Sequence, residues 1–311
     1  MDPQAPDRLA DDTRMDAVTL HVRDLDLMTR YYRDALTLSE LEVPEELELP
    51  AGARREETAV LGRGSTPLVV LHRARDLPAP GRGEAGLFHT AVLFDDEPGL
   101  AHALASVATT APSTFVGSAD HLVSQAFYFT DPEGNGVELY ADRPREAWSW
   151  DGAYVRMDTT YLDPNAFLGE HLTDAARDAL TTADPGARAE ATRSAGAVVG
   201  HVHLQVGDVP AARRFYVDTL GFAETASVPG ALFVSAGGYH HHMAMNTWNS
   251  RGAGPRASTL GLGAVSLTVP GADDVGALRE RLARAGVAVR DDGAALRFDD
   301  PWRNAVEVRA A

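Results

Sequence analysis

Two stretches of this chain align with each other without a gap, and this internal repeat limits its fold more than any other feature. The first stretch opens at Ala17 and reaches Tyr32, and the second opens at His201 and reaches Tyr216 after the same number of positions. Each begins with alternating apolar residues, which predicts a strand, and continues after an Asp into a helix with an apolar face. A repeat of this kind has to be recognised before a fold is assigned.

A second pair of stretches repeats in the same way. One runs from His89 to Asp-Pro-Glu-Gly-Asn-Gly-Val-Glu138, and the other runs from Ala264 to Asp-Pro-Trp-Arg-Asn-Ala-Val-Glu307. Helices are predicted inside them over 98–111 and 274–285, each followed by strands and a turn. The chain therefore divides into four βαβββ units, beginning near residues 17, 89, 201 and 264. We predict an α+β fold in which these units pair into two barrel-like modules.

The remaining segments set the expected domain boundaries. Residues 1–14 are polar and acidic, unlike a secretory signal, and we expect a disordered lead-in on a cytoplasmic protein. The first two units fill 15–142, and the last two fill 199–311. Residues 143–198 match no unit and are rich in Ala, Asp and Arg, which predicts a helical connector with two tryptophans packed against a domain.

Composition narrows the chemistry that the chain can perform. It has no Cys, so disulfides, thiolate nucleophiles and thiolate metal sites are excluded, and any metal must be held by His and carboxylates. No Lys is present either, which excludes Schiff-base catalysis. The net charge of −17 makes nucleic acid an unfavourable partner. No apolar run approaches the roughly 20 residues that a membrane-spanning helix needs.

The opening position of each unit separates the units chemically. Only the second and third units open with a histidine, His89 and His201, and the second unit closes with Glu138. Pairing these two inner units gathers all three side chains at one centre, whereas sequential pairing splits them between two incomplete sites. Two histidines and one carboxylate with open positions form the ligand set of non-heme Fe(II) oxygenases. We therefore predict inner pairing and a metal site; the outer units would gather only Ala17, Ala264 and Glu307.

The third unit closes with three consecutive histidines in a stretch that resembles a strand, from Tyr239 to Asn246. Alternation along a strand sends His241 to one face and both His240 and His242 to the other. Whether His240 or His242 is a fourth metal ligand is left open by the sequence.

These residues together resemble the vicinal-oxygen-chelate superfamily and, within it, the extradiol catechol 2,3-dioxygenases. The resemblance covers nearly the whole chain from about residue 15. It rests on the motifs Gly-Leu-Phe-His89-Thr-Ala, Asp120-His-Leu-Val-Ser-Gln-Ala-Phe-Tyr-Phe-Thr-Asp-Pro-Glu-Gly-Asn-Gly-Val-Glu138-Leu-Tyr-Ala-Asp-Arg-Pro, Gly200-His-Val-His-Leu and Gly237-Gly-Tyr-His-His-His.

The resemblance implies an activity and roles for particular residues. Fe(II), or in some members Mn(II), is held by two His and one Glu, and an aromatic diol is cleaved beside its diol carbons by dioxygen. His241 matches the family's acid–base histidine, and Tyr128 matches its active-site tyrosine. His121 resembles a histidine that hydrogen-bonds the substrate, although its spacing to Tyr128 is shorter here. Ala264 stands where many two-domain members carry a ligand.

Two other functions within the superfamily are alternatives. A glyoxalase-like isomerase or lyase would need four protein ligands, and a metal-bound His240 or His242 would favour it. A small-molecule binding protein of the resistance type usually lacks a metal and has only two units, so the His/His/Glu set argues against it. The substituents of the substrate ring, the choice of Fe or Mn, and whether the chain forms a homo-oligomer are left open.

Overall fold

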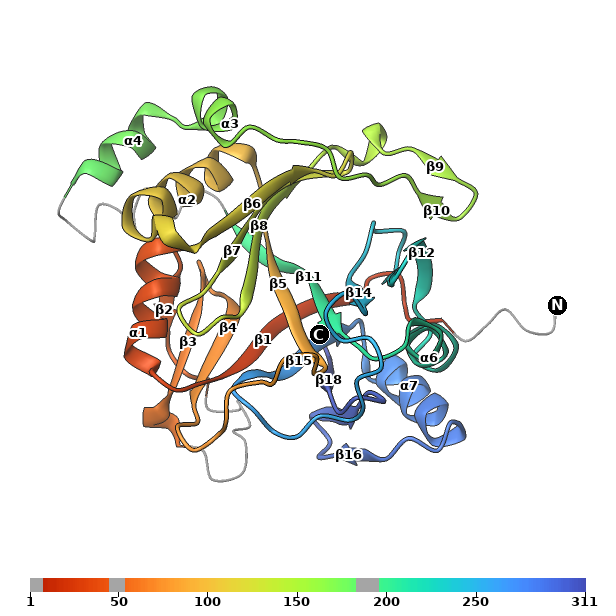
Figure 1. Cartoon of the computed structure of the whole chain (residues 1–311). Helices are drawn as coiled ribbons and strands as arrows, with labels where there is room; N and C mark the ends of the chain where they lie inside the picture. Colours follow the sequence, from red (N-terminus) through yellow and green to blue (C-terminus); the bar gives the residue numbers. More distant parts are fainter. Residues whose placement is uncertain (1–7, 45–53, 183–195) are drawn as a thin grey trace.

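The computed structural model describes residues 8–44, 54–182 and 196–311, which form two curled eight-stranded sheets flanked by helices (Figure 1). In the first sheet the strand order is β16-β17-β18-β15-β1-β4-β3-β2, and in the second it is β12-β13-β14-β11-β5-β8-β7-β6. The strands of the first sheet are β1 (Arg14–Val22), β2 (Ser39–Leu41), β3 (Thr58–Arg63), β4 (Thr66–Arg73), β15 (Gly261–Val269), β16 (Val289–Asp291), β17 (Ala295–Asp299) and β18 (Ala305–Ala310). Those of the second are β5 (Gly86–Phe94), β6 (Phe115–Asp120), β7 (Ser124–Thr130), β8 (Gly136–Asp142), β11 (Ala197–Gln205), β12 (Ala223–Val228), β13 (Ala231–Ser235) and β14 (Met243–Asn246).

The sheets confirm the inner pairing predicted from the repeat. Strand β1 of the first unit runs antiparallel to β15 of the fourth, and β5 of the second unit runs antiparallel to β11 of the third. Each sheet therefore takes one unit from each half of the sequence, and both halves, 15–142 and 199–311, cross between the sheets. The predicted α+β architecture of four units in two barrel-like modules is what the structure shows.

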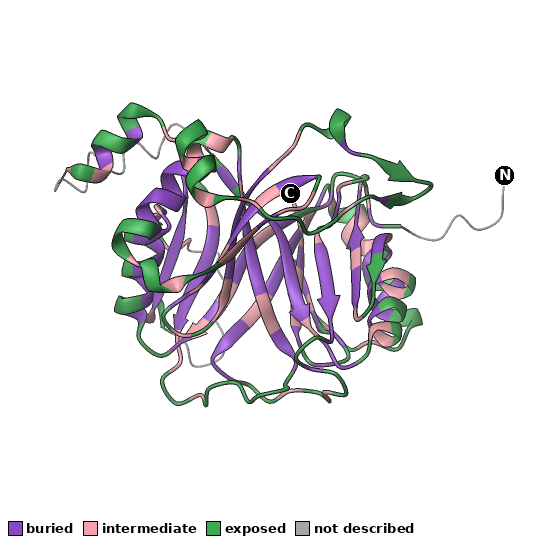
Figure 2. Cartoon of the chain, turned by 45° about the horizontal axis from the view of Figure 1, so that its top comes forward, coloured by how far each residue is buried: buried purple, intermediate pink, exposed green. Residues whose placement is uncertain are grey.

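The helices cover the outer faces of the sheets, and the strands between them are mostly buried (Figure 2). Two of them, α1 and α6, each continue into a π-helical turn at the same place in the repeat, the turn that carries the matching tyrosine. The helices are α1 (Leu25–Arg30) with η1 (Tyr31–Ala35), α2 (Glu97–Thr110), α3 (Pro164–His171), α4 (Asp174–Thr181), α6 (Val209–Arg213) with η5 (Arg214–Thr219), and α7 (Ala272–Arg284). Short 3₁₀ turns are η2 (Arg55–Glu57), η3 (Pro112–Thr114) and η4 (Arg145–Ala147).

The repeated Tyr and Asp residues form the same buried hydrogen bond in both halves of the chain. Tyr32 in the first unit donates its hydroxyl hydrogen bond to Asp131 in the second unit, at 3.1 Å. Tyr216 in the third unit donates to Asp300 in the fourth, at 3.0 Å. Each Asp also accepts backbone and amide hydrogen bonds from its own Asp-Pro turn. The tyrosine therefore ties consecutive units together across the two sheets, which explains why spacing is kept between the repeats.

We expect the Tyr32→Phe variant to lower the free energy of unfolding by about 2 kcal/mol, because the buried Asp131 loses one donor while the ring still packs. Urea denaturation monitored by circular dichroism would measure this change. Tyr154→Phe is the matched control, because Tyr154 is exposed and its hydroxyl donates a hydrogen bond to Glu224 at the surface. The free energy of unfolding of this variant should stay within about 0.5 kcal/mol of wild type. Equal effects of the two substitutions would contradict this role for Tyr32.

The segments outside the units depart from the sequence-based expectation in part. Residues 1–7 of the expected lead-in lie outside the described residues, but 8–14 pack on the body: Leu9 is buried, and its amide donates to the carbonyl of Gly221. Residues 143–182 hold η4, α3, α4 and a small hairpin of β9 (Trp150–Asp151) and β10 (Tyr154–Val155). Trp148 is buried, as expected of both tryptophans, whereas Trp150 lies exposed on the hairpin. The rest of the expected connector, 183–195, lies outside the described residues.

Candidate metal centre

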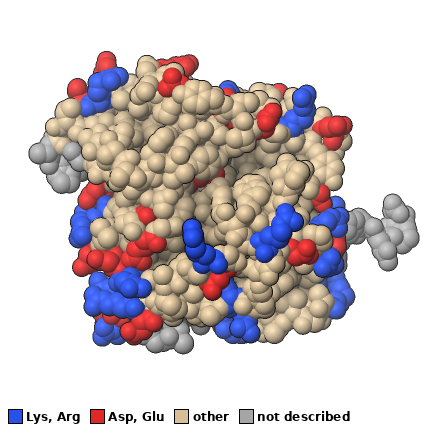
Figure 3. Space-filling model, viewed as in Figure 1, with Lys and Arg blue, Asp and Glu red and all other residues tan. Residues whose placement is uncertain are grey.

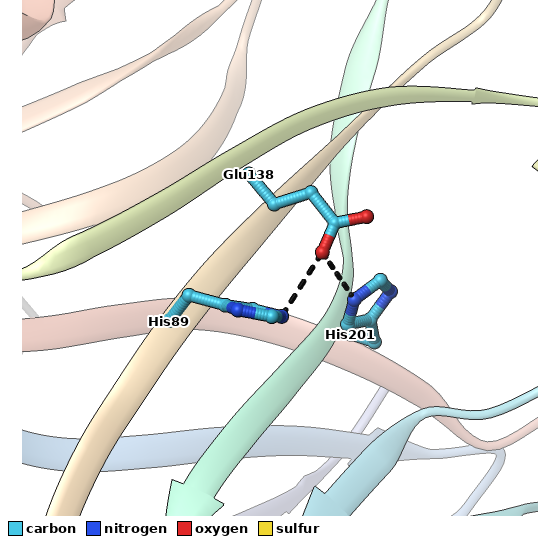
Figure 4. A group of neighbouring side chains, drawn as sticks. All are labelled: His89, Glu138 and His201. Carbon is cyan, nitrogen blue, oxygen red and sulfur yellow. Dashed lines mark hydrogen bonds and ion pairs between the residues drawn. The ribbon is translucent and has the colours of Figure 1, made fainter. Parts of the chain in front are cut away.

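Three neighbouring strands bring His89, Glu138 and His201 together (Figure 4). His89 lies on β5, Glu138 on β8 and His201 on β11, and their ligand atoms all lie within 4.8 Å of one another. Oε2 of Glu138 is 3.0 Å from Nε2 of His89 and 3.1 Å from Nε2 of His201. Among the residues that the structure describes, this is the one group of three or more His, Cys, Asp or Glu side chains placed to hold a metal ion.

Strand alternation and one bulge aim these side chains at a common point. Val137 and Leu139 of β8 point into the core, so Glu138 points to the opposite face. On β11 the register with β5 shifts between Val199 and His201, which sends Val199 to the core and His201 to the site. Gly200 occupies the bulge because a Cβ there would lie 1.8 Å from the hydroxyl oxygen of Tyr140.

The three side chains are almost completely buried, with 6%, 2% and 2% of their residue surfaces exposed for His89, Glu138 and His201. Burial would raise the pKa of Glu138, but His201 and His89 reverse this and hold the pKa of its carboxyl well below its usual range. Burial lowers the pKa of His201 to about 4, although Glu138 opposes the shift. Near neutral pH His201 is thus a neutral imidazole beside the Glu138 carboxylate, the protonation state that metal binding requires.

The donor set fits a divalent metal ion. Within the described chain, the ion-pair contacts of the buried Glu138 are with these two histidines, so a cation bound between them would pair directly with its carboxylate. Nε2 of His89 is buried and lies 3.0 Å from Oε2 of Glu138, so both atoms face the same position. Two imidazole nitrogens and one carboxylate oxygen leave further positions open on an ion, as in non-heme Fe(II) sites.

The other residues predicted to act in the site also lie around this group. The rings of His241 and His201 are 4.1 Å apart, and those of Tyr128 and His89 are 5.7 Å apart. His121 lies one step further out, with Nε2 2.6 Å from the hydroxyl oxygen of Tyr128 and Nδ1 2.8 Å from the carbonyl of Asp158.

For a neutral His121, these contacts direct the hydrogen of the Tyr128 hydroxyl toward His121. A carbonyl only accepts, so Nδ1 of His121 donates to Asp158, and a neutral His121 then accepts the Tyr128 hydrogen at Nε2. Burial, together with Glu138, raises the pKa of Tyr128 well above its usual value, so the phenol stays protonated. An oxygen lone pair of Tyr128 remains available to a neighbouring group.

The expectation of strict alternation through the three histidines is wrong. Strand β14 begins only at Met243, and His240, His241 and His242 lie in the turn before it. Nδ1 of His240 is 2.8 Å from Nδ1 of His241, so these two rings meet instead of pointing to opposite faces. His242 accepts the backbone hydrogen of Ala236 at Nδ1. Neither His240 nor His242 belongs to the metal-ligand group within the described residues.

His203 is a residue of this site that the sequence reasoning missed. It faces the same side of β11 as His201, is 4% exposed, and its ring lies 4.8 Å from that of His89. Neither ring nitrogen has a hydrogen-bond partner in the described part of the chain. The signal was present in the sequence, because a strand places residues two apart on one face.

The matching position in the first sheet is closed to a metal. Ala17 and Ala264 supply no ligand, and Glu307 is held by Arg297 at 2.7 Å and by Arg309. Glu307 is the counterpart of Glu138 in the first sheet, and its carboxylate is thus already paired with two guanidinium groups. Nδ1 of His72, on β4 of this sheet, lies 3.0 Å from the hydroxyl oxygen of Thr58.

Comparison with known proteins agrees with this architecture. A family described as the Glyoxalase/Bleomycin resistance protein/Dioxygenase superfamily matches residues 14–139 and 198–308. The chain belongs to this superfamily. It is 34% identical over 297 residues to a protein of Bacillus subtilis (strain 168) named catechol-2,3-dioxygenase, covering 94% of this chain and 95% of that protein.

Solved structures of the superfamily share the fold. A crystal structure from Bacillus subtilis subsp. subtilis strain 168 matches with a TM-score of 0.59 and 13% identity, covering 97% of this chain and 86% of that one. Glyoxalase I from Zea mays matches with a TM-score of 0.54 and 16% identity, covering 96% of this chain and 92% of that one.

Among the described residues, no helix has the length and apolar character needed to cross a membrane.

Proposed function

We propose that this chain is a metal-dependent extradiol dioxygenase that cleaves a catechol-type aromatic diol with dioxygen, using Fe(II), or alternatively Mn(II), held by His89, Glu138 and His201. The observation that carries the proposal is the buried His/His/Glu group with histidine and tyrosine side chains around it. The 34% identity to a protein named catechol-2,3-dioxygenase supports the same activity. When bound, the metal would bring diol and dioxygen together and stabilise the charge that develops on them.

The remaining residues of the site would handle the diol itself. His241, next to His201, is placed to take the second diol proton as a general base. The lone pair of Tyr128 could accept a hydrogen bond from a substrate hydroxyl, with His121 holding the phenol in place. Figure 3 shows that this face of the molecule is hollowed near its centre, over β5 and β11, where few charged side chains gather. A small, largely apolar ring suits such surroundings.

The glyoxalase-like alternative is less well supported by the site. It needs a fourth protein ligand, and the described residues near the triad offer none in ligating position. Both ring nitrogens of His240 are engaged elsewhere, and Nδ1 of His242 accepts a backbone hydrogen bond. A resistance-type binding protein would have no use for two buried histidines converging on a carboxylate.

The proposal is tested by metal removal and oxidation. We expect protein purified without oxygen and supplied with Fe(II) to convert catechol to a yellow ring-opened semialdehyde, and exhaustive chelation to abolish the reaction. Air or peroxide should inactivate it, and Fe(II) with a reductant should restore it, because the chain has no Cys whose oxidation could mimic this. Full activity after chelation would contradict a metal role, and activity that is insensitive to oxidant would indicate Mn(II).

A further inference from the structure

His241 is the inner end of a hydrogen-bonded chain that leads away from the candidate metal centre. Its Nδ1 lies 2.8 Å from Nδ1 of His240, and Nε2 of His240 lies 3.0 Å from Oδ1 of Asp142. His240 is 1% exposed, whereas the side chain of Asp142, at the end of β8, is 22% exposed. The chain therefore connects the buried site to a carboxylate near the surface.

With Asp142 ionised and His240 neutral, the chemistry of the three groups assigns each hydrogen. An ionised carboxylate only accepts hydrogen bonds, so Nε2 of His240 must donate to Asp142. A neutral imidazole carries one N–H, so Nδ1 of His240 then accepts, and Nδ1 of His241 must be the donor. Nε2 of a neutral His241 is consequently left without a hydrogen, as a base requires.

The surroundings hold this arrangement in place. The Tyr140 hydroxyl oxygen is 2.7 Å from that of Tyr239, whose ring packs against His240. The ring of His240 packs against those of Tyr239 and Trp148, with centroids 4.1 Å and 5.3 Å away. These neighbouring rings restrain His240 from turning.

We infer that Asp142 and His240 are positioning residues that set the tautomer of His241, leaving its Nε2 free to accept a proton in the site. The inference rests on the proposed function in that His241 acts there as a general base. When Nε2 of His241 takes the diol proton, its Nδ1 proton can pass to Nδ1 of His240, and the new imidazolium is then paired with Asp142. One proton enters at Nε2 of His241 and one passes from its Nδ1 to His240. As in other Asp–His arrangements, the carboxylate stabilises the imidazolium without taking the proton.

The tautomer of His241 can be measured without turnover. We expect long-range ¹H–¹⁵N correlation spectra of the full-length chain, histidine-labelled and free of added metal, to show His241 protonated at Nδ1 only and His240 at Nε2 only. The His241→Gln and His240→Gln spectra would assign the signals. Protonation of His241 at Nε2 in the resting chain, as a doubly protonated His240 would impose, would overturn the inference.

Substitution supplies the second test. Asp142→Asn keeps the shape but removes the charge, and we expect it to lower kcat with catechol and Fe(II) by about 10- to 100-fold, the effect typical of an orienting partner, with metal content and KM little changed. The His241 signals should also lose the single Nδ1–H form. Asp151→Asn makes the same chemical change on the exposed β9–β10 hairpin and should alter neither.

The outcomes separate this inference from the proposed function. An unchanged tautomer and unchanged kcat in Asp142→Asn would refute the positioning role while leaving the dioxygenase intact. A wild-type chain that shows the expected tautomer but never cleaves catechol would refute the proposed function and leave the assigned hydrogen-bonded chain standing. If Asp142→Asn does not fold, the wild-type spectrum and His240→Gln still decide.

Discussion

Replacing His201 with alanine is expected to abolish both metal binding and ring cleavage. The substitution leaves one imidazole and one carboxylate, and even the loss of a partner outside the ligand set commonly lowers metal affinity about 10- to 100-fold. A direct ligand should therefore cost more than about 100-fold in affinity, and activity should fall with occupancy. The measurements are metal content by elemental analysis after anaerobic loading with Fe(II), and turnover of catechol.

The repeat supplies a matched control for the carboxylate. Glu138→Gln removes the charge with little change in shape and should lose the metal as His201→Ala does. Glu307→Gln makes the same change at the equivalent position of the fourth unit, where Arg297 and Arg309 hold the carboxylate. It should keep the metal and the activity. If His201→Ala binds a full equivalent of metal and has a native circular dichroism spectrum, the proposed metal centre is contradicted.

The pairing of the units could be predicted from the sequence because the candidate metal ligands and the repeat both indicated that the second and third units lie together. His89 and His201 occupy one repeat position in only two of the four units, and a metal site needs both. Topology followed from that requirement, and the register between β5 and β11 agrees with it. Nothing about propensity alone would have separated inner from sequential pairing.

Local deviations from regular strands could not be predicted in the same way. The bulge at Gly200 depends on the Tyr140 hydroxyl from a different strand, a tertiary contact that periodicity does not contain. The turn at 239–242 likewise breaks the alternation that a regular strand would impose on the three histidines. Leu9 lies in a polar segment, and only its docking beside Gly221 explains why that part is ordered.

His203 shows a different kind of omission. The alternation that places Glu138 opposite Val137 and Leu139 on β8 also places His201 and His203 on one face of β11. The position of His203 has no counterpart histidine in the other units, so comparison of the repeats does not single it out. In a site built on strands, the residue two positions from a predicted ligand should be considered with the ligand.

The second large effect is expected from His241→Ala, which should keep the metal but slow the chemistry. The ring of His241 lies 4.1 Å from that of His201, yet His241 is not part of the ligand group within the described residues. Burial and the neighbouring His201 and His240 hold its pKa well below the usual value, so it stays neutral and can accept a proton. General acid–base residues contribute about 100- to 10,000-fold, and single-turnover rates with catechol at saturating dioxygen should fall by that factor.

His242→Gln is the matched comparison, because His242 belongs to the same three-residue turn but its Nδ1 is bonded to the backbone of Ala236. We expect its rate to stay within about 10-fold of wild type, well short of the loss of a general base. Loss of metal in His241→Ala would make His241 a ligand. A full rate in His241→Ala together with a large loss in His242→Gln would show that the general base is His242 and not His241. In either case the centre formed by His89, Glu138 and His201 would stand, because its three ligand atoms converge without any contribution from the turn.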